Sequence, residues 1–154
     1  MSPAANVAGT VFVDDGLLTD TPDGPALLGS RCADCGAHTF PRQGGCPRCT
    51  GEAMQDVPLH RTGTLWTWTV QGFRPKPPYT GSATHEPYGV GYVELAGQLL
   101  VEARLTESDP ARLRIGMPME LAIVPFREAD GDGGDGGGGG PTHTFAFAPA
   151  GVDR

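Results

Sequence analysis

The four cysteines constrain the fold of this chain more than any other feature, because they occur as two closely spaced pairs. Cys32 and Cys35 form the first Cys-x-x-Cys motif, and Cys46 and Cys49 form the second, with ten residues between the two motifs. Each motif can place two thiolates on one side of a tight turn, and two facing turns supply the tetrahedral ligands that Zn²⁺ accepts. The spacing therefore predicts a zinc ribbon, with a closed structural site that leaves no cysteine as a nucleophile.

The residues beside these motifs fit two tight turns. Gly36 follows the first motif and Pro47 lies inside the second, and both residue types suit the backbone angles of turns. His38 lies between the motifs, but four thiolates already fill the shell, so we interpret it as an exposed loop residue. Iron, paired disulfides and a redox-active Cys-x-x-Cys remain as alternatives to structural zinc.

Length and charge limit the class of protein. The 154 residues can hold one ordinary domain plus a small metal module, and no apolar run is long enough to cross a membrane. The net charge is −7, but four of the 18 acidic residues lie in or beside a glycine tract, which leaves 14 against 11 basic residues elsewhere. This balance disfavours nucleic-acid binding, which needs a basic surface. Residues 1–10 lack a basic start and an apolar core, so we expect a cytoplasmic protein rather than a secreted one.

After the ribbon the pattern is one of short β-strands. In residues 65–70, the two-residue period places Trp66, Trp68 and Val70 on one face. Residues 90–95 and 98–105 flank a short Ala-Gly connection, which predicts an antiparallel hairpin. In its second strand, the residues expected to face inward are Leu99, Val101, Ala103 and Leu105.

Two further runs, residues 119–124 and 144–147, bring the strands to five. This number is small for a sandwich but sufficient for a closed barrel, which also removes exposed strand edges. We therefore predict a mainly β protein, with an N-terminal rubredoxin-like zinc ribbon followed by a five-stranded antiparallel OB-fold barrel. The expected division is a partly ordered N-terminal arm (1–26), the zinc ribbon (27–60) and the barrel (61–150), with a long loop (71–88) and a flexible Gly-rich loop (129–141).

Within the N-terminal arm, Leu17 and Leu18 are expected to form a short helix or turn that docks on a larger surface. The Gly-rich loop carries aspartates and no GK[ST] sequence, so it does not resemble a phosphate-binding loop.

The order of these features resembles a known family, the acyl-CoA-associated proteins with a zinc ribbon and an OB fold that partner thiolase-like enzymes. The resemblance covers about residues 27–149. Besides the cysteines, its marks are the segments GTLWTWTV (63–70), PYGVGYVEL (87–95), IGMPM (115–119) and FAFAP (145–149). It implies a non-catalytic subunit, bound in a hetero-oligomer to a thiolase or a thiolase-like aldolase that acts beside a CoA thioester. Steroid, lipid and aromatic acyl-CoA degradation are the pathways it suggests.

The chain departs from the family pattern in the long loop 71–88 and in the glycine tract. Prolines in the loop hold aromatic side chains, which offer contact area at low ordering cost, and its basic side chains can meet carboxylates or phosphates. An extended surface loop without a function is the alternative. The candidates for contact with the partner or with acyl-CoA are Phe73, Arg74, Lys76, Tyr79, His85 and Tyr88.

No recognised catalytic arrangement is present, although several side chains could act as acids or bases: His60, His85, His143, Tyr92, Glu94 and Glu102. Glu94 and Glu102 stand on one hairpin and could share a site, but we expect them on its solvent face. We therefore expect that the chain is not itself an enzyme.

A role of a different class is single-stranded nucleic-acid binding, because OB barrels and zinc ribbons recur in such proteins. Trp66 and Trp68 could then stack on bases. The negative charge and the single lysine oppose this alternative, so we expect these tryptophans in the barrel core or at a partner contact.

Overall fold

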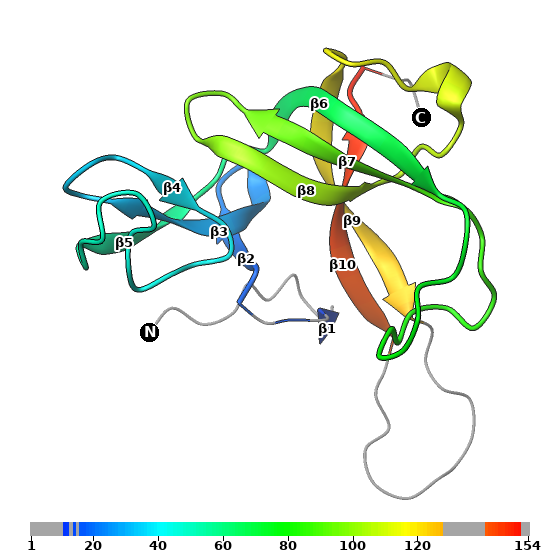
Figure 1. The fold of residues 1–154 in the computed structure, drawn as a ribbon, viewed down its shortest axis with the longest axis horizontal. Helices are drawn as coiled ribbons and strands as arrows, with labels where there is room; N and C mark the ends of the chain where they lie inside the picture. Colours follow the sequence, from blue (N-terminus) through cyan, green and yellow to red (C-terminus); the bar gives the residue numbers. More distant parts are fainter. Residues whose placement is uncertain (1–10, 13, 15, 128–140, 152–154) are drawn as a thin grey trace, which may run out of the picture.

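The computed structural model describes residues 11, 12, 14, 16–127 and 141–151. Within them a small β-module packs beside a larger barrel (Figure 1). After the short β1 (Val11–Phe12), the small module contains β2 (Leu18–Thr21), β3 (Gly24–Cys32), β4 (His38–Thr39) and β5 (Met54–Pro58). The barrel strands are β6 (Thr62–Gln71), β7 (Tyr88–Leu95), β8 (Leu99–Leu105), β9 (Pro118–Arg127) and β10 (Thr142–Pro149).

The small module is organised around β3, which pairs antiparallel with β2, β4 and β5. Gly29 allows this crowding, because a Cβ there would lie 2.5 Å from the carbonyl oxygen of Thr39. Leu18 is 4% exposed and belongs to β2. Leu18 thus lies in a strand and not in the predicted helix or turn, whereas Leu17 lies at a bend just before β2 and packs against the core, in line with the predicted docking. Strand pairing with β3 satisfies the backbone here while the leucine is buried.

The barrel is a ring in the order β6–β7–β8–β10–β9, which returns to β6. The predicted five-stranded OB barrel is confirmed, with one difference in strand direction. The β10–β8 pairing is parallel, whereas the other four pairings in the ring are antiparallel. Strand directions cannot alternate all the way around a ring with an odd number of strands, so closure requires a parallel pair.

One apolar core serves both modules. It joins Leu18, Leu27 and Leu59 of the small module to barrel residues such as Leu65 and Phe147. Across the same junction, the ring of Phe40 meets that of Phe145 edge-to-face, with centroids 5.5 Å apart. The ribbon and the barrel are therefore packed against each other and are not independent domains joined by a linker.

Arg61 reinforces this junction. Its Nε donates to the carbonyl of Pro25 at 2.9 Å and its Nη1 donates to the carbonyl of Asp23 at 2.7 Å. Both acceptors lie in the β2–β3 hairpin, and the backbone of Arg61 accepts from Leu121 of β9 at 2.7 Å. Arg61 thus ties the hairpin to the start of the barrel.

A β-bulge changes the predicted orientation of the tryptophans. The register between β6 and β7 shifts between Leu65, which opposes Val93, and Thr67, which opposes Tyr92. Trp66 is the extra residue, so its side chain is 53% exposed while Trp68 packs against the core. The prediction that Trp66 and Trp68 share a face was wrong, because a bulge breaks the two-residue period.

The remaining predicted strands are confirmed. Val101, Ala103 and Leu105 of β8 are buried, and Leu99 packs against the core. In the described residues the helical content is one turn, η1 (Pro110–Arg112), far short of a helix that could cross a bilayer. Residues 1–10 of the predicted arm, and nearly all of the predicted Gly-rich loop, lie outside the described residues.

Replacing Phe147 with alanine should lower the free energy of unfolding by about 3–5 kcal/mol, because its fully buried ring fills the barrel core. Urea unfolding with zinc present measures the change. Phe73→Ala is the matched control, since that ring is 70% exposed and its loss should change stability by less than about 0.5 kcal/mol. Equal losses in the two variants would contradict the assignment of the core.

Candidate metal centre and barrel surface

Two similar turns present the four cysteines. The first begins at Cys32, the last residue of β3, where the N–H of Gly36 donates to the carbonyl of Cys32 at 2.9 Å. In the second, the N–H of Thr50 donates to the carbonyl of Cys46, also at 2.9 Å. Gly36 and Thr50 both have positive φ, 78° and 63°. Each turn therefore folds back so that its two sulfurs face those of the other.

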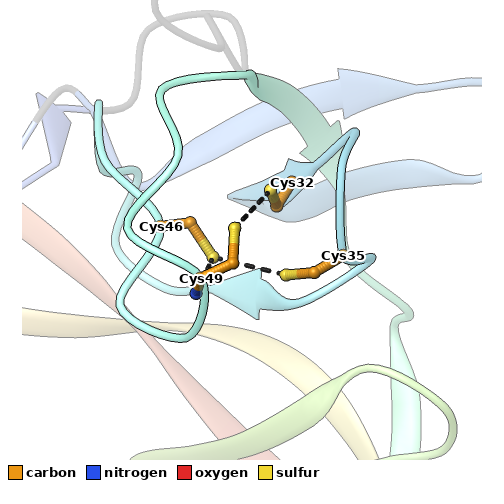
Figure 2. Close-up of side chains that lie close together, drawn as sticks. All are labelled: Cys32, Cys35, Cys46 and Cys49. Carbon is orange, nitrogen blue, oxygen red and sulfur yellow. Dashed lines mark hydrogen bonds between the residues drawn. The ribbon is translucent and has the colours of Figure 1, made fainter.

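The sulfur positions fit one tetrahedral metal ion. All four Sγ atoms lie within 4.8 Å of one another (Figure 2). The Sγ atoms of Cys32 and Cys49 are 3.6 Å apart, and those of Cys35 and Cys46 are 3.5 Å apart. Metal–sulfur bonds of about 2.3 Å in a tetrahedron separate the sulfurs by about 3.8 Å, whereas a disulfide needs about 2.05 Å. The four are free thiols, so the disulfide alternative does not apply to this structure.

Protons and a metal compete for this cluster. The backbone N–H of Cys49 donates to Sγ of Cys46 at 3.5 Å, which is the main cause that lowers the pKa of Cys46 to about 6. For Cys49, the N–H of Gly51 favours the thiolate, but bonds with the other three cysteines outweigh it and raise the pKa to about 12. A divalent cation would stabilise all four thiolates together, and acid would weaken its binding by protonating them.

His38 stays outside the cluster, as expected, but its environment differs from the prediction. It is half-buried in β4, opposite Arg31 of β3, rather than exposed in a loop. Burial, and next the charge of Arg31, lower the pKa of His38 below its usual value. The short strand β4 pairs with β3 at two positions, and the sequence did not indicate this strand.

The six candidates of the long loop divide into two groups. Phe73, Arg74 and Lys76 are exposed at its start. The other three turn toward the barrel: the ring of Tyr79 meets that of Phe126 at 5.8 Å, and His85 lies 6.1 Å from Tyr88 between ring centroids. Tyr88 begins β7 and is partly buried, and its burial is the largest cause that raises its pKa.

Arg104 of β8 is a residue that the sequence did not single out. Its guanidinium carbon lies 4.1 Å from the centroid of the Tyr88 ring, a cation–π contact. In the sequence, Arg104 is recognisable only as a residue on the polar side of an alternating strand, which predicts an exposed side chain. Its contact with Tyr88 depends on the long loop that leads into Tyr88.

The outer face of β6, β7 and β8 carries a second feature that the sequence did not indicate. Trp66 and Tyr92 are 53% and 39% exposed, and their rings meet edge-to-face at 6.3 Å. Leu100, 40% exposed, also belongs to this face, and the hydroxyl of Tyr92 donates to Oε2 of Glu102 at 3.3 Å. The bulge at Trp66 creates this aromatic pair.

Of the candidate acids and bases, Tyr92 and Glu102 are in contact, whereas His60 and His143 lie on other elements. Glu94 and Glu102 are exposed and oppose Leu100 and Tyr92, respectively. His60 lies between β5 and β6, where its backbone donates to the side chain of Gln98 at 2.9 Å. His143 lies in β10, and its buried Nδ1 has no hydrogen-bond partner among the described residues.

Cys46→Ser should release zinc and reduce the soluble yield, because three thiolates bind the ion more weakly and the small module depends on it. Zinc per chain, measured by atomic absorption on the purified protein, tests this expectation. Thr50→Ser at the end of the same turn is the control and should keep the metal. Full zinc occupancy in Cys46→Ser would contradict the assignment of the ligands.

Comparison with known proteins places these features in a family. Two family models match adjoining parts of the chain: the ChsH2 rubredoxin-like zinc ribbon domain over residues 24–55 and the ChsH2 C-terminal OB-fold domain over residues 56–124. These matches agree with the two modules of the structure.

Relatives match most of the chain. The benzoylsuccinyl-CoA thiolase subunit BbsA of Thauera aromatica is 34% identical over 120 residues, which are 76% of this chain and 78% of that protein. A DUF35 domain-containing scaffold protein of Pyrococcus furiosus is 30% identical over 104 residues, 68% of this chain and 73% of that protein. A solved structure, the Ltp2-ChsH2(DUF35) aldolase, superposes with a TM-score of 0.58 at 26% identity, over 81% of this chain and 85% of that chain. By its matched domains and relatives, this chain belongs to the ChsH2 (DUF35) family of zinc-ribbon and OB-fold proteins.

Proposed function

We propose that this protein is a non-catalytic subunit that binds and supports a thiolase-like enzyme, a thiolase or a retro-aldolase, acting on acyl-CoA thioesters. The observation that carries the proposal is the match over about three quarters of both chains to a protein named as a thiolase subunit. The likeness to a chain of an aldolase structure supports the same role for the fold.

The metal in this role is zinc, and it is structural. Four thiolates fill a tetrahedral shell and leave no position at which water or substrate could bind. Cys32 and Cys46 are also buried, with 0% and 3% exposure. Iron would fit the same ligands, but the match to a zinc ribbon model favours zinc. The ion would then hold a module whose own apolar residues are few.

The start of the long loop is the proposed contact with the partner. Phe73 is 70% exposed, with Arg74 and Lys76 exposed beside it, and prolines lie on both sides of Lys76. Exposed aromatic and arginine side chains are enriched among the residues that contribute most to binding energy at interfaces. The Trp66–Tyr92 pair on the outer face offers a second surface of the same kind.

The reaction of the partner is proposed to belong to steroid, lipid or aromatic acyl-CoA degradation. The name of the thiolase subunit from Thauera aromatica, which includes benzoylsuccinyl-CoA, is compatible with the aromatic case. Acyl-CoA would lie near the interface between the two chains. The complex is proposed to be cytoplasmic, where a reducing environment keeps the four cysteines available to the metal.

Co-expression with a thiolase-like protein encoded beside it should yield one complex on gel filtration, and the isolated chain should turn over no acyl-CoA. Phe73→Ala should weaken the complex about thirtyfold, as expected when an interface anchor worth about 2 kcal/mol is lost. Ile115→Ala is the control, because that side chain is 71% exposed and lies outside the loop. Separate elution of the wild-type proteins would refute the proposal.

Single-stranded nucleic-acid binding remains the alternative, and the structure gives it less support. Trp68 packs on the core, so the two tryptophans do not form one stacking platform. Trp66 is exposed, but Glu94 and Glu102 are exposed on the neighbouring strands, where they would repel phosphates.

Fluorescence anisotropy with labelled single strands should therefore show no micromolar binding at low salt. Salt is the informative variable, because phosphate contacts weaken steeply as its concentration rises. Micromolar binding that falls steeply with salt, and that Trp66→Ala abolishes, would replace the partner proposal with the nucleic-acid one.

A further inference from the structure

Three adjoining hollows lie where the long loop meets the barrel. Their volumes are about 340, 360 and 290 Å³, and Tyr88 and Arg104 line all three. We call the combined hollow the Arg104 cleft. It faces β7 and β8 beside the loop that precedes β7, which is the region where OB folds bind ligands. Each hollow is large enough for a small organic group.

The cleft forms because β8 and β10, which close the barrel on this side, pair over only a short length. The parallel β8–β10 pairing contains two register pairs, Arg104 with Ala146 and Leu105 with Phe147. Beyond these pairs, Thr144 and Phe145 of β10 and Ala103 of β8 line an open hollow instead of continuing the ladder. Arg104 thus stands at the point where the two strands separate.

The charge of Arg104 is available to a ligand. The ring of Tyr88 lies 4.1 Å from the guanidinium carbon, and no carboxylate among the described residues forms an ion pair with Arg104. Arg104 is itself only partly exposed. A guanidinium in such a setting retains N–H donors that can bind an anion in a bidentate manner.

One of the three hollows has largely aromatic walls. Tyr79 and Phe126 meet edge-to-face at 5.8 Å, and both line the same hollow as Phe145 and Tyr88. Tyr88 is half-buried, so water is partly excluded from its side of the cleft. A charged hydrogen bond is stronger in such an environment than in open solvent.

The acidic residues of the cleft select the kind of anion. Glu86 and Glu102 line parts of it, and neither lies within ion-pair distance of Arg104. Two carboxylates beside a single guanidinium repel any anion, and they repel a dianion such as phosphate more strongly than a carboxylate, which carries one charge and matches the guanidinium fork.

One polar atom beside the cleft lacks a partner. Nε2 of His85 is buried without a hydrogen bond among the described residues, and His85 lines the hollow that Tyr79 and Arg104 share. Buried polar atoms are rarely unsatisfied in folded proteins. A polar group of a ligand in this part of the cleft could form a hydrogen bond with this nitrogen.

We propose that the Arg104 cleft binds a carboxylate attached to an aromatic group. The guanidinium of Arg104 would hold the carboxylate in a bidentate manner, and Tyr79, Phe126 and Phe145 would contact the ring. Two sources share this chemistry: a small aromatic acid, and the C-terminus of a polypeptide that ends in an aromatic residue. The proposal concerns the chain by itself and does not depend on a thiolase-like partner.

The test is a titration of the zinc-loaded full chain, labelled with ¹⁵N, with four probes. These are 3-phenylpropionate and its amide, and the peptide Gly-Gly-Phe with a free and with an amidated C-terminus. At least one free acid should shift the amide signals of Val90 and Leu105 in a saturable way, and its amide should bind at least about tenfold more weakly. The free acid that binds more tightly identifies the source.

Arg104→Met should weaken binding of the free acid by about ten- to a hundredfold, the loss expected for hydrogen bonds to a charged group. Arg104→Lys keeps the charge without the fork and should bind several-fold more weakly than wild type, which provides a second test if the methionine variant does not fold. Arg114→Met, at an exposed arginine outside the cleft, is the control and should bind like wild type.

Three results would overturn the proposal. They are the absence of saturable shifts with both free acids, equal binding of acid and amide, and binding to both Arg104 variants that matches wild type. Because the titration needs no partner, its outcome is separate from that of the co-expression experiment.

Discussion

The apolar core that continues from the small module into the barrel is the constraint on which the rest of the structure depends. β3 connects this core to the cysteine cluster, because Leu27 of β3 lies in the core and Cys32 is the last residue of the strand. Leu27 also receives the N–H of Leu59 at 2.8 Å, immediately before the barrel begins. A metal that holds the end of β3 therefore also stabilises the packing of its middle against the barrel. In a chain of this length, such sharing adds buried area that a separate ribbon would lack.

The residues that stabilise the fold are therefore different from the exposed residues proposed to bind partners or ligands. The four cysteines cluster in the small module, and the barrel interior is filled by side chains such as Phe147 and Met119, which are fully buried. The exposed surfaces proposed to bind ligands or partners lie on the outside, where the structure departs from regular pairing. The bulge in β6 turns Trp66 outward, and the short β8–β10 pairing opens the cleft around Arg104. Bulges and incomplete ladders are common next to functional sites, because they redirect side chains that regular strands would place elsewhere.

Much of the fold could be predicted because it rests on local patterns. The cysteine spacing indicated the ribbon and its four-cysteine cluster, and the alternation in residues 98–105 identified the inward face of β8. The predictions that failed concern pairing between strands. Leu18 forms a strand because β3 is beside it, and Trp66 is exposed because one residue is inserted opposite β7. β2 pairs with β3 across a tight turn at residues 22 and 23, whereas β6 and β7 are separated by the long loop. In both cases propensity and period within one strand gave the wrong result, because pairing with another strand decides the outcome.

By itself, the sequence determined the four-cysteine cluster, the number of barrel strands and the membership of the family, because each depends on residue types at short, regular spacings. Only the tertiary structure decided which aromatic rings face solvent and which charges meet. Arg104 and Tyr88 are 16 positions apart, and their contact arises from the register of β7 with β8 and the return of the long loop. Side-chain neighbours across strands follow from register, and register is set by the closure of the whole barrel rather than by any one segment.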